Sequence, residues 1–89
     1  MKSRTLPGFW KQFHGLPPEI QDRASRVYRL WRANPFARQL RFKRACHSEP
    51  VYSVRIGQGY RALGLLEGDT VYWYFIGSHD EYEREVRRL

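Results

Sequence analysis

Two arginines, Arg55 and Arg61, flank the segment Gly57-Gln58-Gly59, which has the composition of a hairpin loop. If the residues on either side form paired strands, Arg55 faces Arg61 and both guanidinium groups lie on one side of the sheet. Like charges directly opposite each other destabilise a strand pair, so a bound anion such as a phosphate is the partner that this pair favours. The alternatives are a register shifted by one residue or neutralisation by Asp or Glu side chains.

Aromatic side chains are expected beside this arginine pair. Continuing the same face through a second hairpin places Arg61 near Phe75 and Leu63 near Trp73. Arginines next to exposed rings suit a phosphate with a stacked base, and Trp73 is the candidate stacking residue. In the alternative, these apolar side chains pack against a helix. We expect helices to cover the opposite face, where small side chains allow close approach. That face comprises Val54, Ile56, Ala62 and Gly64.

A histidine, His79, follows the third expected strand and begins the last helix. Imidazole exchanges protons near neutral pH, and the backbone N–H groups of a helix start attract anions. Tyr82, three residues later, either contacts a substrate or belongs to an apolar stripe with Val86. The alternative for His79 is a solvated residue of the first helical turn.

A further basic group precedes the first expected strand, where Lys43 is flanked by Arg41 and Arg44. These side chains are either solvated or contact backbone phosphates. The histidines and the single cysteine, Cys46, lack the spacing of a metal site, so we expect neither a metal nor another cofactor. A glycine-rich phosphate loop, a Ser–His–Asp set and a pair of catalytic carboxylates are absent as well.

The elements that must position these residues are predicted from periodicity. Phe9, Trp10 and Phe13 predict a short first helix, and a second begins at Glu19 and ends at Asn34-Pro35. An antiparallel meander of three to four strands follows. Ser78 with Glu81 forms a capping-box pattern for a short C-terminal helix. We therefore predict an α+β fold in which N-terminal helices pack on a small antiparallel sheet.

Composition narrows the class of partner. The 89 residues contain 16 Lys and Arg against 9 Asp and Glu, and the net charge is +7. This excess favours a polyanionic partner, although composition alone is equally compatible with an inert basic surface.

The length predicts one domain over residues 1–89. One cysteine fits a reducing compartment, and neither a membrane span nor a signal peptide is recognisable, so we expect a cytoplasmic protein.

The order of elements and several short phrases resemble the RelE/ParE toxin superfamily of bacterial type II toxin–antitoxin systems. The phrases are Leu16-Pro17-Pro18-Glu19-Ile20, Asn34-Pro35, Leu40-Arg41-Phe42-Lys43, Tyr52-Ser53-Val54-Arg55-Ile56-Gly57, Tyr60-Arg61-Ala62-Leu63 and Ile76-Gly77-Ser78-His79-Asp80-Glu81-Tyr82. The sequence departs from the family pattern at Ser53, where many relatives carry a second basic residue. It departs again at Ser78-His79-Asp80, where many carry His-Arg after the glycine.

The resemblance implies an antitoxin partner and one of two activities. The RelE branch cleaves mRNA in the ribosomal A site. If this chain cleaves mRNA, we expect attack of a ribose 2′-hydroxyl on the adjacent phosphate, without a metal. Arg55 and Arg61 then stabilise phosphate charge, His79 acts as general acid or base, and Tyr82 orients the nucleotide. The ParE branch instead inhibits DNA gyrase. That activity, or noncatalytic binding of an antitoxin or nucleic acid, is the alternative.

Overall fold

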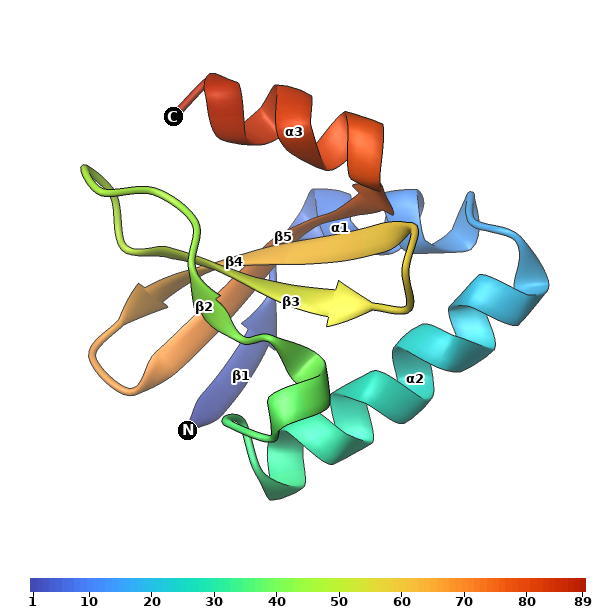
Figure 1. Ribbon diagram of the computed structural model, residues 1–89, viewed down its shortest axis with the longest axis horizontal. Helices are drawn as coiled ribbons and strands as arrows, with labels where there is room; N and C mark the ends of the chain where they lie inside the picture. The colour runs from blue at the N-terminus through green and yellow to red at the C-terminus, as the bar shows by residue number, and fades with distance from the viewer.

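The computed structural model describes the whole chain, residues 1–89, as helices packed on a mixed sheet (Figure 1). This confirms the predicted α+β class. In chain order the elements are β1 (Lys2–Thr5), α1 (Pro7–His14), α2 (Pro18–Ala33), the 3₁₀ turn η1 (Arg38–Leu40), β2 (Lys43–Arg44), β3 (Val51–Ile56), β4 (Tyr60–Glu67), β5 (Thr70–Ser78) and α3 (His79–Arg87).

The sheet has five strands in the order β1-β5-β4-β3-β2, and its antiparallel centre, β3–β4–β5, is the predicted meander. Two short edge strands extend it beyond the prediction. β1 pairs with β5 in parallel, and the two-residue β2 pairs with β3. Both are mostly exposed and lack the apolar alternation by which a strand is recognised in sequence. Their strand structure therefore depends on pairing with the centre.

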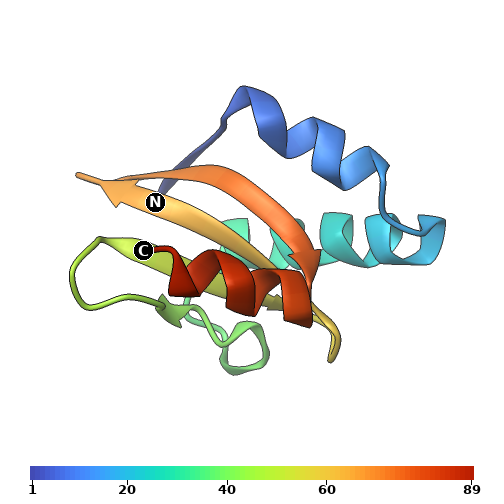
Figure 2. The same cartoon turned by 90° about the horizontal axis from the view of Figure 1, so that it is seen from above.

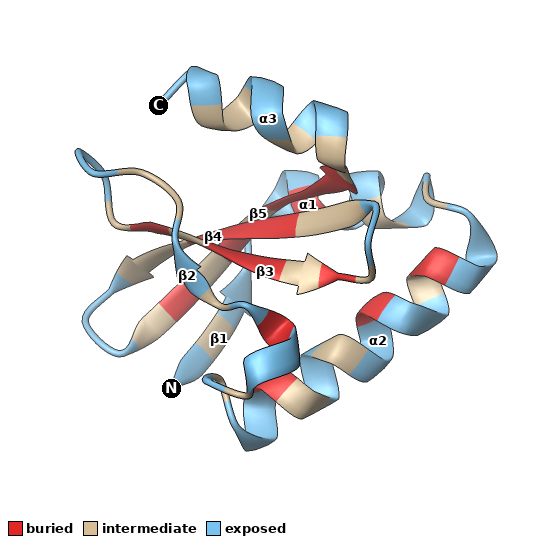
Figure 3. Ribbon diagram, in the orientation of Figure 1, coloured by how far each residue is buried: buried red, intermediate tan, exposed pale blue.

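The main core lies between one face of the sheet and the helices α1 and α2. Ala24 and Trp31 of α2 lie in one buried cluster with Val54, Ile56 and Ala62 of the sheet. This confirms that the face with small side chains is covered by helices. In Figure 3 the buried positions of α2 recur along one side of the helix, as its amphipathic periodicity requires. None of the helices combines the length and the apolar composition that a membrane span requires.

The helix α3 covers part of the opposite face. Its side chains Tyr82 and Val86 pack on a small cluster of Val51, Leu63 and Phe75, and none of its residues is fully buried. Figure 2 shows the sheet running between α1 and α3. The predicted capping box is present: the Ser78 hydroxyl accepts from the Glu81 N–H at 3.2 Å, and the Glu81 carboxylate accepts from the Ser78 N–H at 2.9 Å.

A register shift in the second hairpin corrects the predicted neighbours of the arginine pair. The β4–β5 pairing slips between Leu63 and Gly64, so that Leu63 faces Phe75 while Gly64 faces Trp73. Arg61 faces Gly77 and not Phe75, because Glu67 already pairs with Thr70 across a two-residue turn and the slip moves the pairing by one more residue. Because one extra residue in a strand reverses which side chains point to each face, Trp73 lies with the main core and not with the arginines.

Candidate nucleic-acid interface

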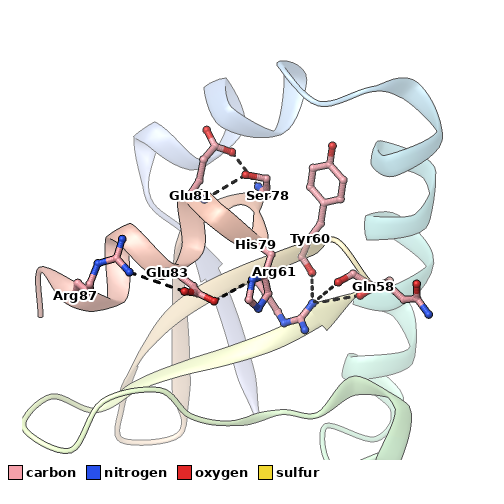
Figure 4. Close-up of polar contacts among 9 residues, drawn as sticks. Gln58, Tyr60, Arg61, Ser78, His79, Glu81, Glu83 and Arg87 are labelled. Atoms are coloured by element: carbon pink, nitrogen blue, oxygen red, sulfur yellow. Dashed lines mark hydrogen bonds and ion pairs between the residues drawn. The ribbon is translucent and has the colours of Figure 1, made fainter.

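The β3–β4 hairpin places Arg55 directly opposite Arg61, as predicted. Both side chains are half-buried and fold toward the hairpin loop. Arg55 Nε donates to the Gly57 carbonyl at 3.1 Å, and Arg61 Nη1 donates to the same oxygen at 3.3 Å. Arg61 Nη1 also lies 2.9 Å from the Tyr60 carbonyl oxygen (Figure 4). Backbone carbonyls thus hold both guanidinium groups at the end of the hairpin.

No carboxylate neutralises this pair. The ion pairs of the protein all lie on α3 or involve Arg88 at its end, and neither Arg55 nor Arg61 has an Asp or Glu oxygen within 4.0 Å. Both alternatives from the sequence, a shifted register and neutralisation by acidic side chains, are therefore wrong. Neutral carbonyl oxygens remove no charge, so a positive site remains that an anion can fill.

The pKa of Arg61 is also affected by the positive charges around it. Burial lowers the pKa of Arg61 from its ordinary value, and the neighbouring charges of Arg55 and Arg41 lower it further. A guanidinium still carries its proton at neutral pH. An anion bound here would replace lost solvation and relieve repulsion at the same time, which strengthens its binding.

The start of α3 brings His79 to the hairpin loop. The backbone N–H of His79 donates to the Gly59 carbonyl at 2.8 Å, and its ring Nδ1 lies 3.2 Å from a carboxylate oxygen of Glu83. When Nδ1 carries the proton and donates it to Glu83, Nε2 is left as a proton acceptor. The His79 side chain is 43% exposed.

Tyr82 lies beside the histidine. Its ring centroid is 5.6 Å from that of His79. Tyr82 also packs on the small cluster beneath α3. The interpretation of Tyr82 as part of an apolar stripe with Val86 is confirmed, and its contact with a substrate stays a prediction.

The basic residues before β3 divide between the two faces. Lys43 pairs with Ser53 and so shares the face of Arg55, and Arg41 lies near enough to act on Arg61. Arg44 pairs with Tyr52, which places it on the other face, where its Nε donates to the Cys46 carbonyl at 2.9 Å. Lys43 and Arg41 thus extend the positive site, whereas Arg44 does not.

A family model for the ParE-like toxin domain matches residues 18–84. The chain belongs to this family. No curated protein matches the sequence. The RelB–RelE antitoxin–toxin complex of Methanococcus jannaschii is similar in fold, with 17% identity over 92% of this chain and 96% of that one and a TM-score of 0.66. The YoeB/ParE toxin of Agrobacterium tumefaciens has 15% identity over 89% and 99%, with a TM-score of 0.69.

One predicted site residue of this ParE-like toxin is a core residue. Trp73 is only 4% exposed, its Nε1 donates to the Ser3 hydroxyl at 3.0 Å, and its ring meets Trp31 edge-on. Phe75 is likewise buried, beneath α3. The expectation of exposed aromatics beside the arginines is therefore wrong for Trp73 and Phe75.

Sequence reasoning missed Glu83, the partner of His79. The signal was available, because residues four apart on a helix are neighbours and a carboxylate can fix an imidazole tautomer. The toxin holds no cluster of His, Cys, Asp and Glu side chains that could bind a metal ion. Proton transfer by His79 and charge stabilisation by arginines are the chemistry that its side chains offer here.

Proposed function

We propose that this RelE/ParE-like toxin cleaves mRNA on the ribosome. The observation that carries the proposal is the pair Arg55 and Arg61, which face each other without a carboxylate partner beside the start of α3. A phosphate seated between them lies next to His79, a group that can move a proton. An acid–base group beside unneutralised guanidinium groups is the combination that phosphodiester cleavage requires.

In the proposed reaction, a ribose 2′-oxygen attacks the adjacent phosphorus and the bond from phosphorus to the 5′-oxygen breaks. His79 Nε2 takes the proton of the 2′-hydroxyl while Glu83 holds Nδ1. The 5′-oxygen takes a proton from water, and the hydroxide left behind takes the proton held by His79 Nε2. The products are a cyclic phosphate and a 5′-hydroxyl. Arg55 and Arg61 stabilise the charge that develops on the phosphate, since a guanidinium cannot act as a base. Tyr82 orients the nucleotide.

The proposal includes two macromolecular partners. The first is the ribosome with its mRNA, whose phosphates match the net charge of +7 and the positions of Lys43 and Arg41. The second is an antitoxin, because the similar structures from Methanococcus jannaschii and Pyrococcus horikoshii are RelB–RelE complexes.

The experiment is a purified translation reaction in which mRNA ends are mapped by primer extension. Native protein is compared with Arg61→Ala and with Arg26→Ala, which removes the same charge from an exposed position of α2. We expect A-site cuts with the native and Arg26→Ala proteins and about 100-fold slower cutting with Arg61→Ala. Folded native protein that makes no cuts rejects the nuclease, and a DNA supercoiling assay then tests gyrase inhibition.

A further inference from the structure

A third arginine reaches the β3–β4 hairpin from another element. Arg23 of α2 lies across Gly57, where a side chain would collide with it: a Cβ at Gly57 would stand 2.9 Å from Arg23 Cδ and closer still to Nη1. Gly57 also has φ of +67°, which other residues rarely adopt. Arg23 therefore contacts the residue whose carbonyl oxygen holds Arg55 and Arg61.

Arg23 has no partner for its charge within the protein. Glu19 lies four residues earlier on α2, the spacing at which a Glu–Arg pair forms on a helix surface. The two nevertheless make no ion pair, and the guanidinium of Arg23 makes no hydrogen bond. Arg23 thus extends to the hairpin and remains exposed there.

The space beside Arg23 is a hollow between α2, η1 and the hairpin. Its volume is about 590 Å³, and its wall includes Arg23, Arg55 and the backbone of the loop from Gly57 to Gly59. No Asp or Glu lines it. Arg55 belongs both to this wall and to the pair with Arg61, so the hollow and the candidate cleavage site are contiguous.

We propose that the hollow is a second phosphate-binding site, in which Arg23 and Arg55 hold a backbone phosphate of single-stranded RNA that flanks the phosphate at Arg55 and Arg61. The RNA backbone then passes over the end of the hairpin, where Arg23 occupies the space that a side chain at Gly57 would take. This inference rests on the proposed function for the identity of the RNA. Arg23 binds and positions the strand without touching the reacting atoms.

The test measures the affinity for a labelled single-stranded RNA oligonucleotide by fluorescence anisotropy as a function of salt concentration. Affinity falls as salt is added, and each phosphate contact on a single strand contributes about 0.7 to the magnitude of the slope of log affinity against log salt. We expect Arg23→Gln to reduce the magnitude of this slope by about that amount. Arg26→Gln, which removes the same charge from the same helix, should leave it unchanged, and Arg23→Lys should restore most of it because a point charge remains.

Equal slopes for the folded Arg23→Gln and Arg26→Gln proteins would overturn the second site. This result is distinct from failure of the proposed nuclease, because the binding assay needs no cleavage. If native protein cleaves mRNA, Arg23→Gln should raise KM and leave the saturated rate near native, whereas Arg61→Ala lowers the saturated rate. A fall in the saturated rate with an unchanged KM would also overturn the assignment of Arg23 to binding.

Discussion

Replacement of Arg55 and Arg61 by glutamine, singly and together, should reveal repulsion between them in the free energy of unfolding. The two residues are directly opposed across β3 and β4 and donate to one carbonyl oxygen, that of Gly57. Each single replacement removes the repulsion but also weakens hydrogen bonds to the loop. The double replacement removes the same repulsion only once, so the two effects do not add.

The size of this coupling follows from the geometry. Directly opposed side chains on a strand pair interact by about 0.2–1 kcal/mol, and we expect the upper half of that range because Arg61 is partly desolvated. A small domain is stable by about 5–15 kcal/mol, so every variant remains folded. The coupling should shrink as added salt shortens the Debye length from about 30 Å at 0.01 M to about 3 Å at 1 M.

The assay is urea unfolding of the four proteins, followed by circular dichroism at low and high salt. Phosphate should stabilise the native protein more than chloride does at matched ionic strength, and the double variant should lose this difference. Additive single effects at low salt, or a coupling that favours keeping both arginines, would refute the electrostatic reasoning about the site.

Two further predictions concern β4 and β5. Gly64→Ala should lower the free energy of unfolding by about 1–3 kcal/mol, because the new Cβ would stand 2.9 Å from Trp73 and closer to Val71. In a thermal melt, each kcal/mol corresponds to a fall in Tm of about 4–8 °C. A Tm within about 2 °C of native would contradict this prediction. Burial raises the pKa of Tyr74 to about 12, aided by Glu85, and its buried hydroxyl has no partner. Because the folded protein favours the neutral phenol, the protein keeps its full stability below the pKa of about 10 that Tyr74 has in the unfolded chain. Part of the free energy of unfolding is then lost as the pH rises toward 12. Tyr74→Phe should be neutral or stabilising at pH 7 and lose less stability in alkali, measured by urea unfolding at pH 8 and 11.

The sequence predicted those parts of the fold that local patterns determine. The apolar stripe of α2, the capping box of α3 and the loop from Gly57 to Gly59 depend on residues a few positions apart. The strand β1 could not be predicted in this way, because its structure comes from pairing with β5 at the far end of the sequence. The slip between Leu63 and Gly64 was hidden for a similar reason, since packing in three dimensions selects it.

The same division applies to the candidate site. The opposed arginines were predictable because a short loop fixes their register, and His79 because it directly follows a strand. Trp73 was misplaced because its face depends on the slip in β5. Arg23 carried no signal in the sequence, since only the tertiary packing of α2 brings it to Gly57.

The pairing of β1 with β5 has a consequence for the order in which the protein folds. The side chains of Ser3 and Trp73 are hydrogen-bonded although the residues are 70 positions apart. Closing a chain segment of that length costs about 4 kcal/mol of free energy through lost conformational entropy. The arginine hairpin closes only a short loop and can form early. We therefore expect the anion site to assemble with the meander, while the N-terminal strand docks last and is among the first segments to open in native-state hydrogen exchange.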